Sequence, residues 1–205
     1  TNVAYDKRRE DNVVLPNKFS FKLAEFIGYY MGDGHKSSDF SLRLTDADTQ
    51  ILNYHKNLIK EIFNFEAKIR KHSDKTKNAS ILEINNVKII RFLEQNFPEA
   101  FNKAKEIYLP DKIANSYPEI QKYFLKGFAD AEGSFTDVIK ITTYSRKMLE
   151  DLQYLFSLQK IPSTISFKNN SVYLSSKYSM KRFSEIIGFS HKSKQEKLLL
   201  KINHL

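Results

Sequence analysis

The stretch EFIGYYMGDGH, from Glu25 to His35, reads as the end of a buried helix that carries glycines in its interior. Gly28 and Gly32 interrupt an otherwise apolar run, and each helical glycine costs about 1 kcal/mol relative to alanine. Asp33 and another glycine follow at once. A helix with such costly positions needs a structural reason for them.

A second copy of this pattern lies in the other half of the chain. LKGFADAEG, from Leu125 to Gly133, aligns with FIGYYMGDG at a constant offset of 99 residues. The alignment pairs glycine with glycine or alanine, and it pairs Asp33 with Glu132. Further on, LRLTDADTQIL and IKITTYSRKML align at an offset of 97. The sequence therefore contains an internal duplication of long period.

Both halves show the same order of periodic segments. Residues alternate between apolar and polar after each motif, which predicts a strand, and apolar residues at helical spacing follow. Two strands joined by a polar turn and another helix complete each half. We therefore expect an α+β fold with the order helix, two strands, helix, two strands, helix in each half. The expected organisation is an N-terminal tail (1–14), a first half (15–102), a linker region (103–118) and a second half (119–205), whose first helix begins at a Ser116 to Glu119 capping box.

The small residues in the two motifs form stripes that would let the two helices pack closely. Such packing would bring Asp33 and Glu132 together at one end of the pair, where two like charges need a proton or a cation between them. Without cysteine or paired histidine, the oxygen ligands favour Mg²⁺, and paired metals can activate a phosphodiester. One Asp-Gly alone would indicate only a helix end, but a repeated acid in register favours a nuclease site.

Composition limits the remaining classes of function. The 205 residues include 33 Lys and Arg against 24 Asp and Glu, a formal charge of +9 that favours polyanionic partners. The absence of cysteine excludes disulfides and thiolate sites. The five histidines are scattered, which disfavours a zinc site. With no apolar signal core or membrane span in the sequence, we expect a soluble, intracellular protein, in a prokaryotic cytoplasm or an organelle.

FIGYYMGDG and LKGFADAEG resemble the two signatures of a single-chain, two-motif LAGLIDADG homing endonuclease. The resemblance implies two αββαββα halves related by a pseudo-twofold axis, with the LAGLIDADG helices at the interface and two antiparallel four-stranded sheets forming a DNA-binding saddle. It implies a monomer with an internal pseudo-dimer, which hydrolyses both strands of a long asymmetric double-stranded DNA site in intron homing.

For the metal site, the resemblance implies coordination of two or more Mg²⁺ ions by the carboxylates of Asp33 and Glu132 and the backbone carbonyls of Gly32 and Ala131, with Mn²⁺ or Ca²⁺ able to replace Mg²⁺ in binding. It also implies a catalytic lysine near the metals in each half. Lys112 is the first-half candidate, and Lys192 or Lys194 is the second-half candidate.

Polar strand residues on the faces opposite the core are expected to contact DNA. Basic side chains suit guanine edges, and the basic turn after Lys71 suits phosphate. The expected DNA-binding residues are Lys36, Ser41, Arg43, Thr45, Lys68, Arg70, Lys75 and Lys77 in the first half, and Lys140, Thr142, Arg146, Ser166, Lys168, Tyr173, Ser175 and Lys177 in the second.

Two other functions fit the same pattern. A non-cleaving nucleic-acid-binding relative, such as an RNA maturase or a regulator, would keep the fold, but it has no physical need for two juxtaposed carboxylates facing a polyanion. The endonuclease domain of an intein would have the same activity in another context. The chain lacks a splicing nucleophile near Thr1 and ends in NHL, which favours a free-standing enzyme.

Overall fold

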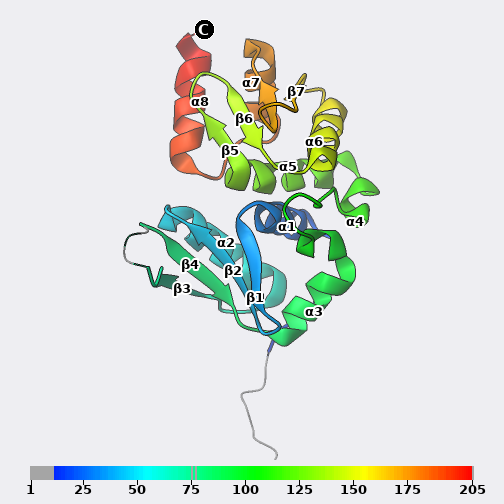
Figure 1. Ribbon diagram of the computed structural model, residues 1–205, viewed down its shortest axis with the longest axis vertical. Coiled ribbons are helices and arrows are strands. Elements are labelled where there is room, and N and C mark those ends of the chain that lie inside the picture. Colours follow the sequence, from blue (N-terminus) through cyan, green and yellow to red (C-terminus); the bar gives the residue numbers. More distant parts are fainter. Residues whose placement is uncertain (1–11, 75, 77, 205) are drawn as a thin grey trace, which may run out of the picture.

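The computed structural model describes residues 12–204 except positions 75 and 77, and it consists of two similar halves joined along a central helix pair (Figure 1). The first half contains α1 (Phe21–Asp33), β1 (Gly34–Ser38), β2 (Ser41–Asp46), α2 (Thr49–Phe63), β3 (Lys68–Lys71), β4 (Ser80–Ile84) and α3 (Val87–Asn96). A 3-10 helix (Pro98–Phe101) and α4 (Asp111–Ala114) lead to the second half.

The second half repeats this order. It contains α5 (Pro118–Glu132), β5 (Gly133–Phe135), β6 (Ile139–Thr142), α6 (Arg146–Leu158), β7 (Thr164–Ser166), β8 (Ser171–Leu174) and α7 (Lys177–Ile186), followed by α8 (Lys192–His204). The αββαββα order predicted for each half is therefore confirmed. None of the helices in the described part of the chain has the length and apolar character that crossing a bilayer requires.

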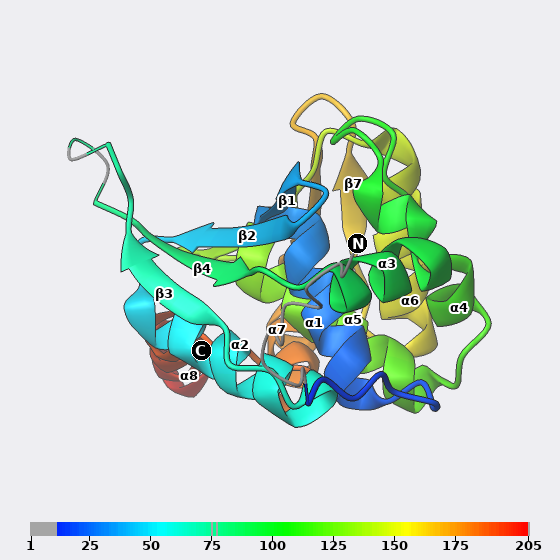
Figure 2. The same cartoon turned by 90° about the horizontal axis from the view of Figure 1, so that it is seen from below.

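Each half has one four-stranded antiparallel sheet. The strand orders, β1-β2-β4-β3 and β5-β6-β8-β7, correspond position by position. Strand residues alternate between a buried and an outward face, so that Leu42 and Leu44 of β2 are fully buried while Arg43 between them is not. In the first half, α2 covers one face of the sheet and the other face is uncovered (Figure 2). The two halves lie on either side of the helix pair (Figure 1). The two predicted sheets are confirmed.

The α1 and α5 helices pack side by side, and the glycines make this contact possible. A Cβ built on Gly28 would lie 2.2 Å from the carbonyl oxygen of Phe124, and one on Gly127 would lie 2.0 Å from that of Glu25. Real Cβ atoms cannot approach backbone this closely, so each glycine admits the backbone of the other helix. Both helices end together and lead directly into the first strand of their sheets.

The segment between the halves is more ordered than a polar linker. Ile107, Leu109 and Ile113 are buried in the core, and Leu109 N donates a hydrogen bond to Asp151 of α6. The capping box predicted for α5 was wrong. Tyr117 is the N-cap, and no side chain makes a capping hydrogen bond there. The Ser116 hydroxyl lies before the helix and donates to the Ile113 carbonyl.

The strand ends and the C-terminal segment also differ from expectation. Lys168 and Ser175 follow the ends of β7 and β8 rather than lying in them. The polar stretch that carries Lys192 and Lys194 forms the first turn of α8, which packs against α7 and β5 and buries Leu198. A helix here fixes the position of Lys194, which a loop would not.

Candidate active site and nucleic-acid interface

The central helix pair brings two carboxylates together at one end. Asp33 is the last residue of α1 and Glu132 the last of α5. A Cβ built on Gly32 would lie 2.4 Å from Cβ of Ala131 and 2.9 Å from Cγ of Glu132, so the two helix ends touch here. The small residues of both motifs therefore position the acids beside each other.

Burial raises the pKa values of both acids, and neighbouring negative charge adds to the shift of Asp33. Burial raises the pKa of Asp33 to about 7, with further contributions from the charges of Glu132 and Asp46. Burial also raises the pKa of Glu132 to about 7. The charge of Lys194 opposes both shifts. Two desolvated carboxylates that feel each other's charge are stabilised as anions by a nearby cation, which a metal ion can provide.

A third acid, Asp46 at the end of β2, was not anticipated from the sequence. Its Oδ2 accepts a 2.8 Å hydrogen bond from the hydroxyl of buried Tyr29, and its Oδ1 accepts one from Asp48 N. Burial is the main cause of the raised pKa of Tyr29, and Asp33 and Asp46 add to it. The missed signal is topological: β2 pairs antiparallel with β1 and so returns to the end of α1.

Of the three candidate lysines, the structure brings Lys194 to the acids. Burial lowers the pKa of Lys194, while Asp130, Asp46, Asp33 and Glu132 act to raise it. Its Nζ donates a 2.6 Å hydrogen bond to the carbonyl oxygen of Asp130. Lys192 is exposed on α8. Lys112 is on α4 and donates to Asn96 Oδ1, so its side chain is engaged outside the carboxylate group.

A buried aspartate inside the second motif anchors the segment that leads to Lys194. Asp130 Oδ1 accepts hydrogen bonds from the backbone N–H groups of Ser190 (2.8 Å) and His191 (3.2 Å). Burial raises the pKa of Asp130 to about 6. His191 Nε2 then lies 3.3 Å from Asp48 Oδ2 of the first half. Sequence reasoning passed over Asp130, although the first motif has Met31 at the matching place.

The predicted DNA-contacting residues that the structure describes lie in several different settings. The outward sheet faces carry Arg43, Thr45, Lys68 and Arg70 in the first half and Lys140, Thr142, Ser166 and Tyr173 in the second, while Arg146 and Lys177 begin α6 and α7. Lys36 of β1 is paired with Asp39 and Glu94 at 2.7 and 2.6 Å. The hydroxyl oxygen of Ser41 is buried, which is a correction to its expected exposure to DNA. Lys75 and Lys77 lie outside the described residues.

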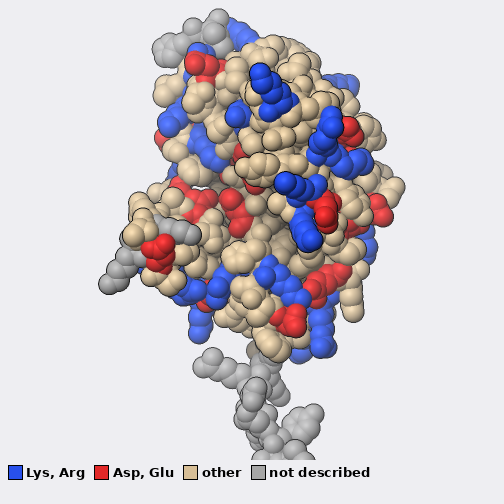
Figure 3. Space-filling model, viewed as in Figure 1, with Lys and Arg blue, Asp and Glu red and all other residues tan. Residues whose placement is uncertain are grey.

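The surface charge is divided between this centre and its surroundings. In the space-filling view, acidic side chains gather in the hollow between the two halves, and basic side chains are spread over the surface above and below it (Figure 3). A bound polyanion would contact the basic side chains around the hollow. At the acidic centre of the hollow, a cation would be needed to offset the repulsion between the polyanion and the carboxylates.

The donor set of this centre fits Mg²⁺. Among the residues that the structure describes, no group of three or more His, Cys, Asp or Glu is arranged to enclose a metal ion. Mg²⁺ typically binds through one or two carboxylates together with water and substrate phosphates, and Asp33 and Glu132 supply two such carboxylates. The pair therefore suits a metal whose coordination is completed in part by water and by substrate phosphate oxygens.

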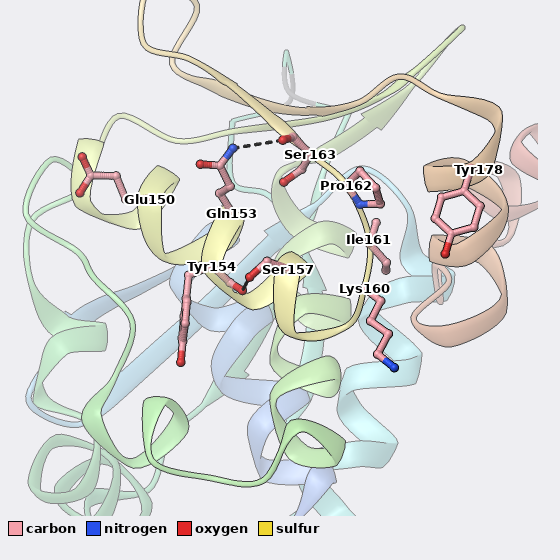
Figure 4. Close-up of a pocket in the computed structure, with 9 residues that line it drawn as sticks. All are labelled: Glu150, Gln153, Tyr154, Ser157, Lys160, Ile161, Pro162, Ser163 and Tyr178. Carbon is pink, nitrogen blue, oxygen red and sulfur yellow. Dashed lines mark hydrogen bonds between the residues drawn. The ribbon is translucent and has the colours of Figure 1, made fainter.

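A separate cavity of about 730 Å³ lies on the second half. It lies between α6, the segment from Lys160 to Ser163, and Tyr178 of α7, and Gln153 crosses part of it to donate a 3.1 Å hydrogen bond to the Ser163 carbonyl (Figure 4). Neither Asp33 nor Glu132 lines it, so this cavity is distinct from the carboxylate site.

Comparison with known proteins identifies the repeated unit. The family model described as a LAGLIDADG-like domain matches residues 20–96 and again 119–188. Mesophilic variants of the homing endonuclease I-DmoI share the fold, with a TM-score of 0.60, 19% identity, and coverage of 83% of this chain and 92% of theirs. WhiA from Thermatoga maritima also matches, with a TM-score of 0.56, 15% identity and coverage of 92% and 62%.

Two curated relatives come from Methanocaldococcus jannaschii. A glutamine--fructose-6-phosphate aminotransferase is 32% identical over 95% of this chain, and a replication factor C small subunit is 27% identical over 95%. The chain spans only 19% and 11% of the length of these relatives. Sequences similar to this chain thus occur as parts of longer proteins that have different names.

Proposed function

The chain belongs to the LAGLIDADG family, and from this we propose that it is a monomeric, site-specific endonuclease that cuts both strands of a long asymmetric DNA duplex. The observation that carries the proposal is the pair of half-buried carboxylates, Asp33 and Glu132, at the joined ends of α1 and α5. A protein that only binds a polyanion gains nothing from two such acids, whereas phosphodiester hydrolysis with divalent ions uses them.

The carboxylates of Asp33 and Glu132, with the carbonyls of Gly32 and Ala131, would hold the divalent ions. Mg²⁺ bound there supplies Lewis-acid activation of the phosphate and of the attacking water. Solved structures of I-DmoI are described with DNA and with Ca, Mn or Mg, which supports divalent ions for this chain. Because α1 and α5 contribute one acid each, we assign one strand of the duplex to each half.

Lys194 is the residue that would balance developing negative charge. Its ammonium lies in the field of all the acids of the site and is partly desolvated, so that its charge is weakly screened. The side chain of Asp130 holds the segment just before α8. Its backbone carbonyl accepts a hydrogen bond from Lys194. Asp46 and Tyr29 would hold the end of β2 against the helix pair.

The two outward sheet faces would hold the duplex. Strand side chains such as Arg43 and Lys140 would read base edges in the major groove, while the cations at the helix starts, Arg146 and Lys177, would contact phosphate and set the position of the DNA. Lys112 and Lys192 are in this view surface cations that assist DNA binding.

Cleavage of a randomised duplex library in Mg²⁺, followed by sequencing of the cut ends, tests this function. We expect a single long site cut on both strands, no cutting in EDTA, and no double-strand cutting by Asp33→Asn or Glu132→Gln, with DNA affinity largely kept. Glu66→Gln, which removes an exposed acid of the first half, is the matched control. Full cleavage by either motif variant would disprove the site, and binding without cleavage by the wild type would indicate a non-cleaving relative.

A second candidate function is the endonuclease domain of an intein. The recurrence of this region as 19% of an aminotransferase and 11% of a replication factor subunit favours it, because a mobile module explains such unrelated contexts. Expression of the complete reading frame that encodes the chain distinguishes the two. A spliced product of host mass supports the intein, and a single unspliced protein supports the free-standing enzyme.

A further inference from the structure

One row of side chains crosses the outward face of the first sheet. Backbone register places His35 opposite Arg43, Arg43 opposite Glu83, and Glu83 opposite Lys68, across all four strands. Directly opposite residues on antiparallel strands share a face, and Leu42 on the other face is fully buried. The row therefore lies on the face assigned to DNA, and its one carboxylate lies between an arginine and a lysine.

The second sheet has a corresponding row. Register places Ser134 opposite Lys140, Lys140 opposite Tyr173, and Tyr173 opposite Thr164. Because the strand orders of the two sheets match, Tyr173 takes the place of the first-sheet carboxylate, and Lys140 takes that of Arg43. The two halves thus present different chemistry at corresponding points of a pseudo-symmetric surface.

Glu83 holds two arginines at once. Its Oε1 accepts a 2.9 Å hydrogen bond from Nε of Arg43 on β2 and a 2.8 Å bond from Nη2 of Arg70 on β3. The Glu83 side chain is 14% exposed, whereas the Arg43 and Arg70 side chains are 34% and 39% exposed. The carboxylate therefore lies beneath two guanidinium groups that reach further into solvent.

The two arginines are held in different ways. Arg70 uses one terminal nitrogen for Glu83 and directs the other, Nη1, to the carbonyl of Lys71 at 3.3 Å. Arg43 uses Nε, so neither of its terminal nitrogens takes part in the contact with Glu83. The guanidinium plane of Arg43 is fixed while its outer fork remains available to a ligand.

This geometry suits recognition of a guanine. A guanidinium fork donates two hydrogen bonds to O6 and N7 of guanine in the major groove, and one such bidentate contact gives roughly 5- to 150-fold discrimination against a wrong base. A carboxylate facing DNA repels phosphate, and its presence is useful where it orients a cation. At the matching place in the second half, Lys140 has a point charge on a flexible stem and no carboxylate opposite it.

We propose that Glu83 is a specificity-determining positioning residue: through Arg43 it fixes a guanine in the half-site under the first sheet, a requirement that the second half-site lacks at the corresponding position. This rests on the proposed function of binding duplex DNA. The bases preferred by the two halves should then differ in a defined way, although the halves share one fold.

Selection of bound duplexes from a randomised library, with the full chain in Ca²⁺ and sequencing of the bound fraction, tests the inference. We expect the wild type to prefer guanine at one position of one half-site by at least about fivefold. Glu83→Gln and, separately, Arg43→Lys should bring this preference to within about twofold of the other bases, and leave the other half-site unchanged. Glu66→Gln, with the same change of charge in the same half, should keep the wild-type profile. Thermal melting checks that each variant is folded.

The possible outcomes distinguish failure of this inference from failure of the proposed function. Enrichment of a site whose guanine preference survives either Glu83→Gln or Arg43→Lys, or is lost equally in both half-sites, overturns the role of Glu83 and leaves DNA binding intact. If Glu83→Gln is unfolded, Glu83→Asp takes its place with the same expected loss, because the shorter side chain withdraws the carboxylate from Arg43 while keeping its charge. A wild-type protein that enriches no duplex overturns the proposed function and this inference together.

Discussion

Gly127 of α5 lies against the backbone of Glu25 of α1, so closely that a Cβ at Gly127 would be 2.0 Å from the Glu25 carbonyl oxygen. Gly28 makes the reciprocal contact with Phe124. The two halves are therefore joined through backbone packing at glycines, and the acids at the helix ends depend on this approach.

Substitution of either glycine by alanine should destabilise the protein. Intrinsic helix propensity alone would stabilise each variant by about 1 kcal/mol, but separating the helices to admit a methyl group should cost more, about 1–3 kcal/mol net. Urea unfolding of Gly28→Ala and Gly127→Ala measures this, with Glu150→Ala on the exposed face of α6 as control. Unchanged or raised stability in both glycine variants would contradict the close packing.

Lys194 and Lys192 should differ sharply in their effect on cleavage. Loss of a charge that stabilises the transition state typically reduces kcat by 10²- to 10³-fold, so we expect about that loss in Lys194→Met. Lys192→Met, two residues earlier on the exposed surface of the same helix, should remain within about threefold of the wild type if it contributes only to the screened surface field. Single-turnover cleavage at saturating enzyme separates chemistry from binding. Equal losses in both variants would argue that α8 contributes only general charge.

Lys126 of the second motif belongs to a group of polar side chains between the two halves. Its Nζ lies 3.0 Å from Glu25 Oε1, which also accepts a 2.7 Å hydrogen bond from the Tyr54 hydroxyl. Burial alone would lower the pKa of Lys126, but Glu25 outweighs it and the pKa is raised.

Removal of one member of this pair should cost more than removal of both. Lys126→Met leaves Glu25 buried without its cation, which typically costs 3–5 kcal/mol. The double variant Glu25→Gln with Lys126→Met should recover a large part of that loss, since replacing a whole buried pair is often nearly neutral. A double-mutant cycle by urea unfolding measures the coupling. Additive losses would show that the pair is not energetically linked.

His55 should make the protein sensitive to acid. Its ring is fully buried and its centroid lies 3.8 Å from that of Tyr29. Burial, with help from the charge of Lys126, lowers the pKa of His55 to about 3. The unfolded chain takes up a proton near pH 6.5 that the folded chain refuses until about pH 3, so stability falls as pH decreases across this window.

The change in unfolding free energy between pH 7 and pH 4 should be smaller in His55→Phe than in the wild type. A second histidine variant, His72→Phe, is the control because His72 is only half-buried and directly follows β3. Identical pH dependence in the wild type and His55→Phe would show that His55 is not the group that binds the proton.

Divalent ions should stabilise the folded protein in the absence of DNA. A ligand that binds only the folded state raises its stability in proportion to RT ln(1 + [L]/Kd). We expect the melting temperature to rise with Mg²⁺ or Ca²⁺ and this rise to be abolished in Asp33→Asn. The same variant should melt higher than the wild type in EDTA, because one of two apposed, desolvated carboxylates is neutralised. A variant that keeps the full response to metal would place the ions elsewhere.

The sequence alone determined the architecture of this protein. A repeat of glycine, acid and glycine at constant offset, each copy followed by alternating and then helical patterns, was sufficient to predict two αββαββα halves, the helix interface and the apposition of Asp33 with Glu132. These features follow from local periodicity and from the absence of Cβ atoms, both of which are visible in a linear sequence.

Only the tertiary structure identified the other residues of the candidate site and of the sheet surface. Asp46, Asp130 and the choice of Lys194 over Lys192 depend on where β2 returns and how α8 packs, and the sharing of Glu83 by Arg43 and Arg70 depends on register between strands far apart in the chain. Ser41 lies in β2 as predicted, but its hydroxyl oxygen is buried, because the burial of one hydroxyl is set by neighbouring side chains. Periodicity assigns a residue to a face of a helix or strand, but only three-dimensional packing determines which groups then come within hydrogen-bond distance.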